Sequence, residues 1–315
     1  EIVSSIDILE QKGLRILVIS GVLVLIFGYI LAGILIKPFA KITKAIEDIT
    51  DGFQDEKISV PDYTETELIT DAFNKMLGRV QSLDTSRQEF VSNVSHELKT
   101  PLTSMKVLAD SLVGQENVPV ELYQEFMQDI AAEIDRESKI ITDLLTLVKL
   151  DKKASNMNIE LVNINELLDM ILKRLHPIAA KRNIELILEG FRPVDAEIDE
   201  TKLSLAISNL VENAIKYNKD EGWVRVSLNA DHKYFYVTVT DSGLGIPEES
   251  IDHIFERFYR VDKSHSTEIE GTGLGLAIVH QIAVLHGGDV QVKSDLDGTV
   301  FSVWLPLQQK KERQT

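Results

Sequence analysis

Residues 223–247, WVRVSLNADHKYFYVTVTDSGLGIP, decide the fold of the C-terminal half of the chain. Trp223–Ala230 and Tyr234–Thr240 each alternate apolar with polar residues, which is typical of strands that bury one face. The polar triplet Asp231-His232-Lys233 between them predicts the turn of a β-hairpin. Asp241–Pro247 follows the second strand directly, so the hairpin is expected to lead into a glycine-rich loop.

Strands and helices alternate on both sides of this hairpin. The pattern predicts further strands at 159–164, 184–188 and 194–198, helices at 164–181 and 200–216, and a second hairpin that turns at Asp297-Gly298 between strands 290–294 and 299–305. We therefore expect residues 155–307 to form one domain, a two-layer α/β sandwich with much antiparallel pairing. The polar residues 308–315 are expected to form a tail.

The N-terminal part of the chain contains one strongly apolar segment. Residues 16–36, ILVISGVLVLIFGYILAGILI, carry no charge and are bracketed by Arg15 and Lys37. As a helix this segment would span about 31 Å, the thickness of a hydrocarbon core. A signal peptide is the competing interpretation, but its apolar region is shorter and ends in a cleavage site with small residues. The segment therefore predicts a transmembrane helix, with residues 1–15 as the juxtamembrane end of a missing sensor region.

Composition excludes several classes of protein. The 315 residues include 50 acidic and 33 basic ones, for a net charge of −17, which argues against nonspecific binding to nucleic acid. A hydrophobic content of 44% excludes a wholly disordered chain. Cysteine is absent, so disulfides, zinc knuckles and thiol nucleophiles are excluded.

The segment after the apolar one predicts a pair of helices. Apolar residues at helical spacing (Ile42, Ala45, Ile46, Ile49) predict a helix that begins near Pro38. Gly52 and Pro61 break residues 50–64, which are expected to form a connector before a second helix from Glu65. This layout favours a parallel coiled-coil relay at 37–85, and a plain pair of bundle helices is the alternative.

The second helix is expected to continue without a loop as far as Leu112. A turn at Gly114–Pro119 then precedes another amphipathic helix over 122–148. Two such helices bury too little apolar surface on their own. We therefore expect residues 86–151 to dimerise into a four-helix bundle.

His96 lies on the first of these helices, in the segment FVSNVSHELKTPL (90–102). The zinc motif H-E-x-x-H fails here because residue 100 is threonine. Thr100 shares a helix face with His96, and Pro101 is expected to bend or loosen the helix beside it. Taken alone, the pattern would favour a solvated histidine on a bundle surface.

Two glycine-rich segments and one helix face carry the remaining chemistry. Asp241–Pro247 and Gly271–Leu276 match neither the Rossmann fingerprint nor the P-loop, but glycines before a helix let backbone amides approach phosphate oxygens. Asn209, Asn213 and Lys216 are spaced along one helix face. Together with Glu212 they could hold Mg²⁺ and phosphates.

These segments resemble, in the right order, the boxes of membrane sensor histidine kinases of bacterial two-component systems. Residues 90–101 resemble the phosphoacceptor box, 209–216 the asparagine box, and 241–247 and 271–276 the two glycine boxes. FERFYR (255–260) is similar to the phenylalanine box, and 37–85 to a HAMP relay. The resemblance covers nearly all of residues 16–307. It departs at the N-terminus, where a typical member has an earlier membrane helix and an extracytoplasmic sensor.

The resemblance implies a multidomain protein, with a transmembrane helix, a HAMP relay, a dimeric four-helix bundle and a Bergerat-type ATP-binding sandwich. It implies that His96 attacks the γ-phosphorus of ATP, that Glu97 acts as general base, and that Asn213 and Glu212 hold Mg²⁺. Asp241 would accept a hydrogen bond from the adenine amine, and residues between Lys263 and Gly271 would form a mobile lid. The implied nucleotide-binding residues are Asn209, Asn213, Lys216, Tyr217, Asp241, Gly243, Gly245, Arg260, Gly271, Thr272, Gly273, Leu274 and Gly275.

The same resemblance implies the partners and the location of the protein. We expect a homodimer in a bacterial cell membrane, with its kinase portion in the cytoplasm, that passes phosphate from His96 to an aspartate of a response regulator. A phosphatase activity and no direct contact with nucleic acid are also expected. Two alternatives remain: an ATPase of the same fold without a phosphohistidine, and a catalytically dead membrane scaffold. The other histidines (His176, His232, His253, His265, His280, His286) show no ligand spacing and are expected to be structural or surface residues.

A substitution of Thr100 tests whether the kinase and phosphatase activities of one helix face can be separated. Its hydroxyl could orient a water toward an aspartyl phosphate on a docked receiver protein, whereas the imidazole of His96 serves the kinase reaction. Thr100→Ala should therefore keep autophosphorylation near the parent level and slow dephosphorylation of the partner by about 10²-fold. The decay of label on a phosphorylated partner measures this, and equal decay rates would leave Thr100 with only a structural role before Pro101.

Overall fold

The computed structural model describes residues 2–50, 64–113, 119–151, 157–190, 192–261, 271–295 and 297–309. The chain falls into two compact units, Glu1–Val91 and Ser92–Thr315. The expected connector, the turn after residue 113, the expected lid and the end of the polar tail lie largely or wholly outside the described residues.

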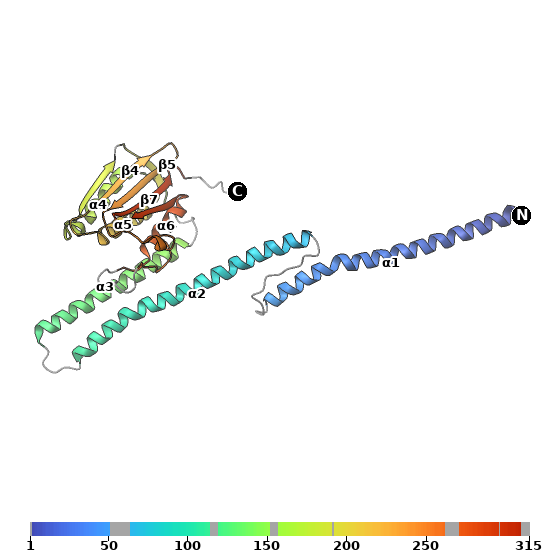
Figure 1. The fold of residues 1–315 in the computed structure, drawn as a ribbon, viewed down its shortest axis with the longest axis horizontal. Coiled ribbons are helices and arrows are strands. Elements are labelled where there is room, and N and C mark those ends of the chain that lie inside the picture. Colours follow the sequence, from blue (N-terminus) through green and yellow to red (C-terminus); the bar gives the residue numbers. More distant parts are fainter. Residues whose placement is uncertain are drawn as a thin grey trace. The chain divides into compact units, whose positions relative to one another are not determined.

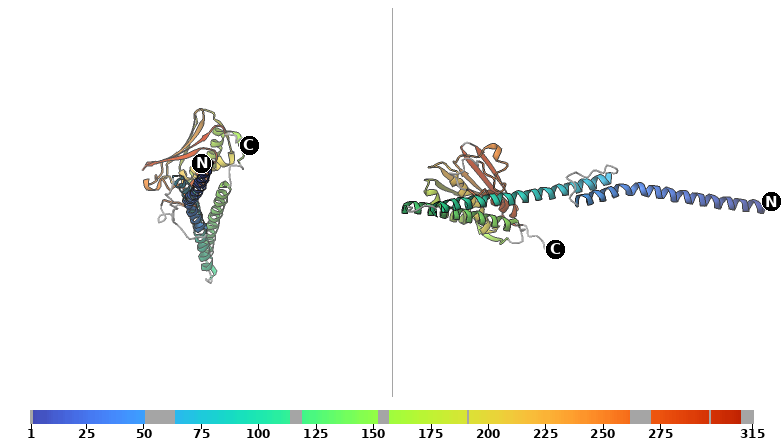
Figure 2. Two further views of the ribbon diagram at one scale, coloured as in Figure 1. Left: turned by 90° about the vertical axis from the view of Figure 1, so that its right-hand side faces the viewer. Right: turned by 90° about the horizontal axis from the view of Figure 1, so that it is seen from below.

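The first unit contains one long apolar helix, α1 (Ile2–Thr50), which runs as a single ribbon in Figures 1 and 2. Its segment Lys12–Lys44 is long and apolar enough to cross a membrane, and its most apolar stretch has a mean hydropathy of 2.6 and is not buried within the protein. The expectation of a new helix near Pro38 is wrong, because Pro38 lies inside α1. Proline removes one backbone hydrogen bond, but its fixed φ is compatible with a helix that continues on both sides.

Helix α2 (Thr64–Val113) joins the two units, and α3 (Val120–Asp151) follows it in the chain. The continuity of α2 confirms that no loop separates the segment after Glu65 from the segment that carries His96. Pro101 lies within α2, and the backbone is helical on both sides of it. Three buried residues of α3, Ile140, Leu147 and Leu150, lie on the part of the helix nearest the α/β domain in sequence.

The α/β domain contains a five-stranded sheet in the order β2-β4-β5-β7-β6, of which β4, β5 and β7 are labelled in Figure 1. Strands β2 and β4 pair in parallel, and the other neighbours are antiparallel. The strands are β2 (Glu185–Gly190), β4 (Trp223–Ala230), β5 (Tyr234–Asp241), β6 (Asp289–Asp295) and β7 (Gly298–Pro306). A separate antiparallel pair joins β1 (Glu160–Asn163) to β3 (Asp195–Ile198). Both predicted hairpins are confirmed.

Three helices pack on this sheet: α4 (Ile164–Ala180), α5 (Glu200–Lys216) and α6 (Gly275–Leu285). Alternate residues of β4 and β5 are fully buried while the residues between them are partly exposed, so one face of the sheet carries the helical layer. This arrangement confirms the two-layer sandwich. A single-turn 3₁₀ helix, η2 (Glu248–Ser250), follows the loop after β5.

The sheet register places one acidic side chain at the end of a central strand. Asp241, the last residue of β5, lies opposite Val224 of β4 and opposite Thr299 of β7. A residue with a strand on each side is shielded from solvent along the sheet. The register therefore buries the residue that begins the glycine-rich loop.

A buried histidine joins the end of α6 to the start of α5. The imidazole of His286, which follows α6, is 0% exposed. Its Nε2 accepts a hydrogen bond from the backbone N of Asp199 at 3.1 Å, and its Nδ1 donates to the carbonyl of Ile282 at 2.8 Å. Asp199 is the N-cap of α5 and accepts from the backbone N of Lys202. Only the neutral imidazole can accept and donate in this way.

This contact predicts a loss of stability in acid. Burial lowers the pKa of His286, and the nearby charge of Lys202 adds to this, against the opposing effects of the Ile282 hydrogen bond and of Asp199. The stabilisation is therefore present above the unfolded pKa of about 6.5 and is lost as the pH falls below it, by up to about 1.4 kcal/mol per unit. Thermal unfolding of the whole chain, followed by the fluorescence of Trp223 and Trp304, measures it.

The matched variant is His286→Gln, which keeps a donor and an acceptor but does not titrate. It should lower the melting temperature at neutral pH and respond less than the parent to a change from about pH 7.5 to about pH 5.5, the range that brackets the unfolded histidine. An equal response of the two proteins would mean that His286 does not set the acid sensitivity.

Candidate nucleotide-binding site

The face of α5 that carries asparagine and lysine lies against the second glycine-rich segment. A Cβ built on Gly271 would lie 2.7 Å from Nζ of Lys216, and one on Gly275 would lie 3.5 Å from Oδ1 of Asn209. Gly275 is the first residue of α6, so the segment 271–275 brings the N-terminus of that helix to α5. The structure thus joins two segments that the sequence separates by about fifty residues. Backbone amides at a helix N-terminus, beside a lysine, favour an anion.

The first glycine-rich loop contributes a buried carboxylate. Asp241 is 8% exposed, and its Oδ1 accepts hydrogen bonds from the backbone N of Gly243 at 2.9 Å and of Thr299 at 3.2 Å. Burial raises the pKa of Asp241, and these two backbone donors oppose the rise. Among the residues that the structure describes, both donors reach Oδ1, so the second oxygen could accept from a ligand. Thr299 was not predicted for this site, and no local pattern marks it, because its place follows from strand pairing.

Lack of space and backbone conformation both require glycine in the two glycine-rich loops. At Gly243 the need is space, because a Cβ there would lie 2.5 Å from the backbone oxygen of Tyr217. The same oxygen accepts a hydrogen bond from the backbone N of Leu244 at 3.1 Å. At Gly273 the conformation adds to the lack of space, since its φ is +67°, in the left-handed region, and a Cβ there would lie 2.8 Å from the Phe258 backbone. The first loop is therefore pressed against the end of α5, and the second turns sharply before α6.

Two cationic side chains gather around Tyr217, which is 40% exposed. The ammonium of Lys216 lies 5.2 Å from the centre of the Tyr217 ring. Burial raises the pKa of the Tyr217 hydroxyl, and the positive charge of Arg260 opposes the rise. Arg260 lies two residues after the buried Phe258. The backbone N of Phe258 donates to the carbonyl of Gly273. The phenylalanine-rich segment thus supports the second glycine loop.

The structure restricts the part that Leu274, one of the predicted nucleotide-binding residues, could play in binding. Its side chain is 0% exposed, so it belongs to the core, and only its backbone could contact a ligand. Its backbone N donates to the hydroxyl of Thr272 at 3.2 Å. Gly245 stays in the loop with a φ of +73°.

Side chains of α3 contact two of the predicted site residues. The sequence did not indicate these contacts. The hydroxyl of Thr272 donates to Oδ2 of Asp143 at 3.0 Å, and Nζ of Lys139 lies 3.3 Å from Oε2 of Glu212. Burial raises the pKa of Asp143, while Thr272 and Lys139 oppose the rise. The site therefore includes charged side chains from a helix outside the sandwich.

Asn209 supplies an observation that points to a ligand. Its Nδ2 is buried and has no hydrogen-bond partner among the described residues. A buried donor without a partner costs about 1–3 kcal/mol, so a phosphate oxygen at this position would relieve a penalty. The described residues contain no group of three or more histidine, aspartate or glutamate side chains arranged to hold a metal ion. A divalent cation here would therefore need oxygens from a phosphate as well as from Asn213 and Glu212.

His96, Glu97 and Thr100 lie on α2 and take no part in the contacts described above. The side chains of His96 and Thr100 are exposed and line one shallow surface depression together with Lys99 and Thr103. The hydroxyl of Thr100 donates to the carbonyl of His96 at 3.1 Å. The shared helix face predicted for these two residues is confirmed.

Comparison with protein families identifies two segments. Residues 86–153 match the His Kinase A (phospho-acceptor) domain, and residues 198–309 match the histidine kinase-, DNA gyrase B- and HSP90-like ATPase family. The second match alone would fit an ATPase without a phosphohistidine. The first disfavours that alternative, because it places His96 within a phospho-acceptor domain.

Two curated relatives are sensor kinases. The chain is 34% identical over 236 residues to the sensor histidine kinase WalK of Bacillus subtilis, which covers 74% of this chain and 38% of that protein. It is also 34% identical over 231 residues to the sensor protein kinase WalK of Staphylococcus aureus, which covers 72% of this chain and 55% of that protein. The chain thus spans less than two thirds of each relative.

Solved structures share the architecture. Full-length ShkA in complex with AMPPNP matches with a TM-score of 0.52 at 26% identity, over 70% of this chain and 46% of ShkA. Histidine kinase ThkA in complex with the response regulator protein TrrA matches with a TM-score of 0.59 at 23% identity, over 74% of this chain and 67% of that one, which shows a common fold. By its two domains, its relatives and its fold, the chain belongs to the sensor histidine kinases of bacterial two-component systems.

Proposed function

We propose that this chain transfers the γ-phosphoryl group of ATP to His96 and then passes it to an aspartate of a response regulator. The observation that carries the proposal is the convergence of Asn209 and Lys216 on the segment Gly271–Gly275, with the buried Asp241 in the neighbouring loop. One end of this cluster is cationic and rich in backbone amides, and the other offers a carboxylate acceptor. ATP presents phosphates at one end and an amine at the other.

Asp241 would select the base. Its second carboxylate oxygen would accept a hydrogen bond from the exocyclic amine of adenine, a group that guanine replaces with a carbonyl. At the other end, Lys216 and Arg260 would neutralise phosphate charge, and the Nδ2 of Asn209 would donate to a phosphate oxygen. Asn213 and Glu212 would hold Mg²⁺, which when bound supplies neutralisation of phosphate charge.

His96 would act as the nucleophile. A lone pair on one ring nitrogen forms the bond to phosphorus while the bond between phosphorus and the bridging oxygen of ADP breaks, so that ADP leaves with the electron pair. Glu97, the next residue on α2, would take the proton from the other ring nitrogen. The exposure of His96 suits a group that must meet a nucleotide held by another domain and then a partner protein.

The helices around His96 support a second copy of the chain as partner. Apolar side chains remain exposed along the second half of α2 and along α3: Leu102, Val107, Val113, Val120, Tyr123, Met127, Ile134, Ile141, Leu145 and Val148. Apolar stripes of this length are buried in bundles of helices. We therefore propose a homodimeric four-helix bundle over 86–151, preceded by a relay at 37–85.

The apolar part of α1 supports attachment to a membrane. With residues 16–36 as the span, the proposed location is the bacterial cell membrane, with the kinase portion in the cytoplasm. Thr100 would serve the proposed phosphatase activity.

A substitution of the phosphoacceptor tests the reaction. The whole chain in detergent micelles, given Mg²⁺ and ATP labelled at the γ position, should acquire a label that is labile in acid and stable in base, as expected for a phosphoramidate. His96→Gln should abolish the label while ATP affinity is unchanged, because His96 lies outside the nucleotide cluster. The control His176→Gln, at an exposed position of α4, should label normally. Undiminished labelling of His96→Gln would refute the assignment of the nucleophile.

A second substitution tests adenine recognition. Asp241→Asn should weaken ATP binding by about 1.5–3 kcal/mol, since a charge-assisted hydrogen bond becomes at best a neutral one. Because burial raises the pKa of Asp241, acid should weaken ATP binding to the parent at a higher pH than for an ordinary aspartate, and the variant should respond less. Titration calorimetry measures both effects. The exposed Asp252→Asn is the control, and equal affinities of Asp241→Asn and the parent would rule out the adenine role.

A further inference from the structure

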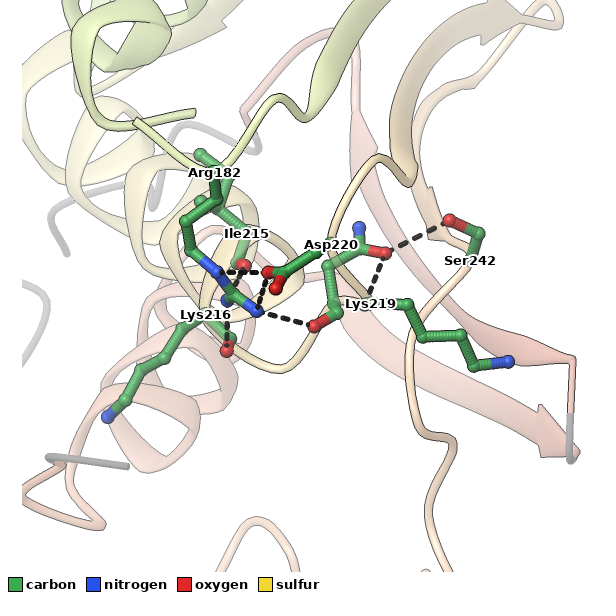
Figure 3. Close-up of polar contacts among 7 residues, drawn as sticks. Arg182, Ile215, Lys216, Lys219, Asp220 and Ser242 are labelled. Atoms are coloured by element: carbon green, nitrogen blue, oxygen red, sulfur yellow. Dashed lines mark hydrogen bonds and ion pairs between the residues drawn. The ribbon is translucent and has the colours of Figure 1, made fainter. Parts of the chain in front are cut away.

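Arg182 lies in the turn after α4, outside the cluster that faces the nucleotide. Its guanidinium makes five hydrogen bonds, which are drawn in Figure 3. Nη1 donates to the carbonyls of Ile215 and Lys216, each at 2.8 Å, and Nη2 donates to the carbonyl of Asn218 at 2.8 Å. Nη2 and Nε also donate to Oδ1 of Asp220, at 3.0 and 3.2 Å. All five N–H groups of the guanidinium are thus used.

The three carbonyls belong to the end of α5 and the residues just beyond it. The last carbonyls of a helix have no partner within the helix, and a positive charge beside them is favourable. Asp220 is 80% exposed on its side chain, so the ion pair itself contributes little. Arg182 therefore acts mainly by holding backbone oxygens in a fixed arrangement, which its planar, forked side chain suits.

The backbone that Arg182 holds carries the predicted phosphate and loop contacts. Lys216 places its ammonium beside Gly271, and the Tyr217 carbonyl meets the loop at Gly243 and Leu244. Lys216 and Tyr217 both lie within the turn 215–218, whose carbonyls at Ile215, Lys216 and Asn218 Arg182 binds. A shift of this turn would move the ammonium and the loop together.

Asn218 extends the contact to the adenine end of the site. It is 3% exposed, and its Nδ2 donates to the carbonyl of Trp223 at 3.0 Å. Its Oδ1 accepts from the hydroxyl of Ser242 at 3.0 Å and from the backbone N of Lys219 at 2.9 Å (Figure 3). Ser242 is the neighbour of Asp241. Hydrogen bonds thus run from Arg182 through Asn218 to the residue beside the buried carboxylate.

We propose that Arg182 is a positioning residue for ATP binding. It fixes the turn at residues 215–218, so that Lys216 at the phosphate end and Asp241 at the adenine end keep a constant separation. The proposal rests on the ATP-binding role proposed above. Ile215 and Ala214 are buried in the core, so apolar packing still anchors α5 when the guanidinium is removed. Loss of Arg182 should therefore loosen the site more than it unfolds the domain.

The test compares the parent with Arg182→Gln, Arg182→Lys and the control Arg225→Gln, all as the whole chain in detergent micelles. Arg225 offers a matched guanidinium, since it pairs with Glu189 at 3.1 Å and lies over the Trp223 ring, whereas the carbonyls at the end of α5 are bound by Arg182. Calorimetry with Mg²⁺ and ATP is run at a temperature where tryptophan fluorescence shows every protein folded. Arg182→Gln should bind about tenfold more weakly, because small misplacements in a site are costly. Arg182→Lys should be intermediate, and Arg225→Gln should match the parent.

Kinetics separate positioning from a purely structural role. In the labelling reaction, Arg182→Gln should raise the KM for ATP more than it lowers the rate at saturating ATP. A lower melting temperature with unchanged affinity and KM would overturn the proposal. If Arg182→Gln does not fold, Arg182→Lys decides, and parent-like binding by that variant would overturn the proposal too. A parent chain that binds no ATP would instead refute the proposed function, and this inference with it.

Discussion

The close approach of the Tyr217 carbonyl to Gly243 is the constraint on which the rest of the candidate site depends. A side chain at residue 243 would collide with that oxygen, and the same oxygen already accepts from the backbone N of Leu244. The end of α5 and the loop after β5 therefore meet backbone to backbone. This contact sets the distance between a lysine on the helix and a carboxylate at the end of the strand, and a ligand that spans them must have matching dimensions.

The sheet and the core hold each side of this contact in place. Asp241 ends β5 between β4 and β7, so its carboxylate is buried and two backbone amides direct its Oδ1. On the other side, buried apolar residues anchor α5, Asp199 caps its start, and Arg182 binds the carbonyls at its end. Hydrophobic packing places the elements approximately, and hydrogen bonds to backbone groups then set their exact separation.

The helical part of the chain adds a different requirement. His96 is exposed on α2, while the proposed nucleotide residues belong to the sandwich, so the proposed phosphoryl transfer needs the two to meet. Asp143 and Lys139 of α3 contact Thr272 and Glu212 of the sandwich. Helix α3 therefore contacts two residues that the proposed reaction also uses.

The sequence by itself determined both hairpins, the helix stripes, the long apolar segment and the residue types of the glycine-rich loops. Each of these follows from a local period or from the conformational needs of single residues, which a sequence displays directly. Only the tertiary structure decided that Thr299 donates to Asp241, that Asp143 meets Thr272, that Leu274 is a core residue and that Arg182 closes the end of α5. The structure also decided the place of Pro38. The residue locally suits the first turn of a helix, but α1 continues through it. Such contacts join residues far apart in the chain, and they depend on how packed elements meet, a property that no local pattern carries.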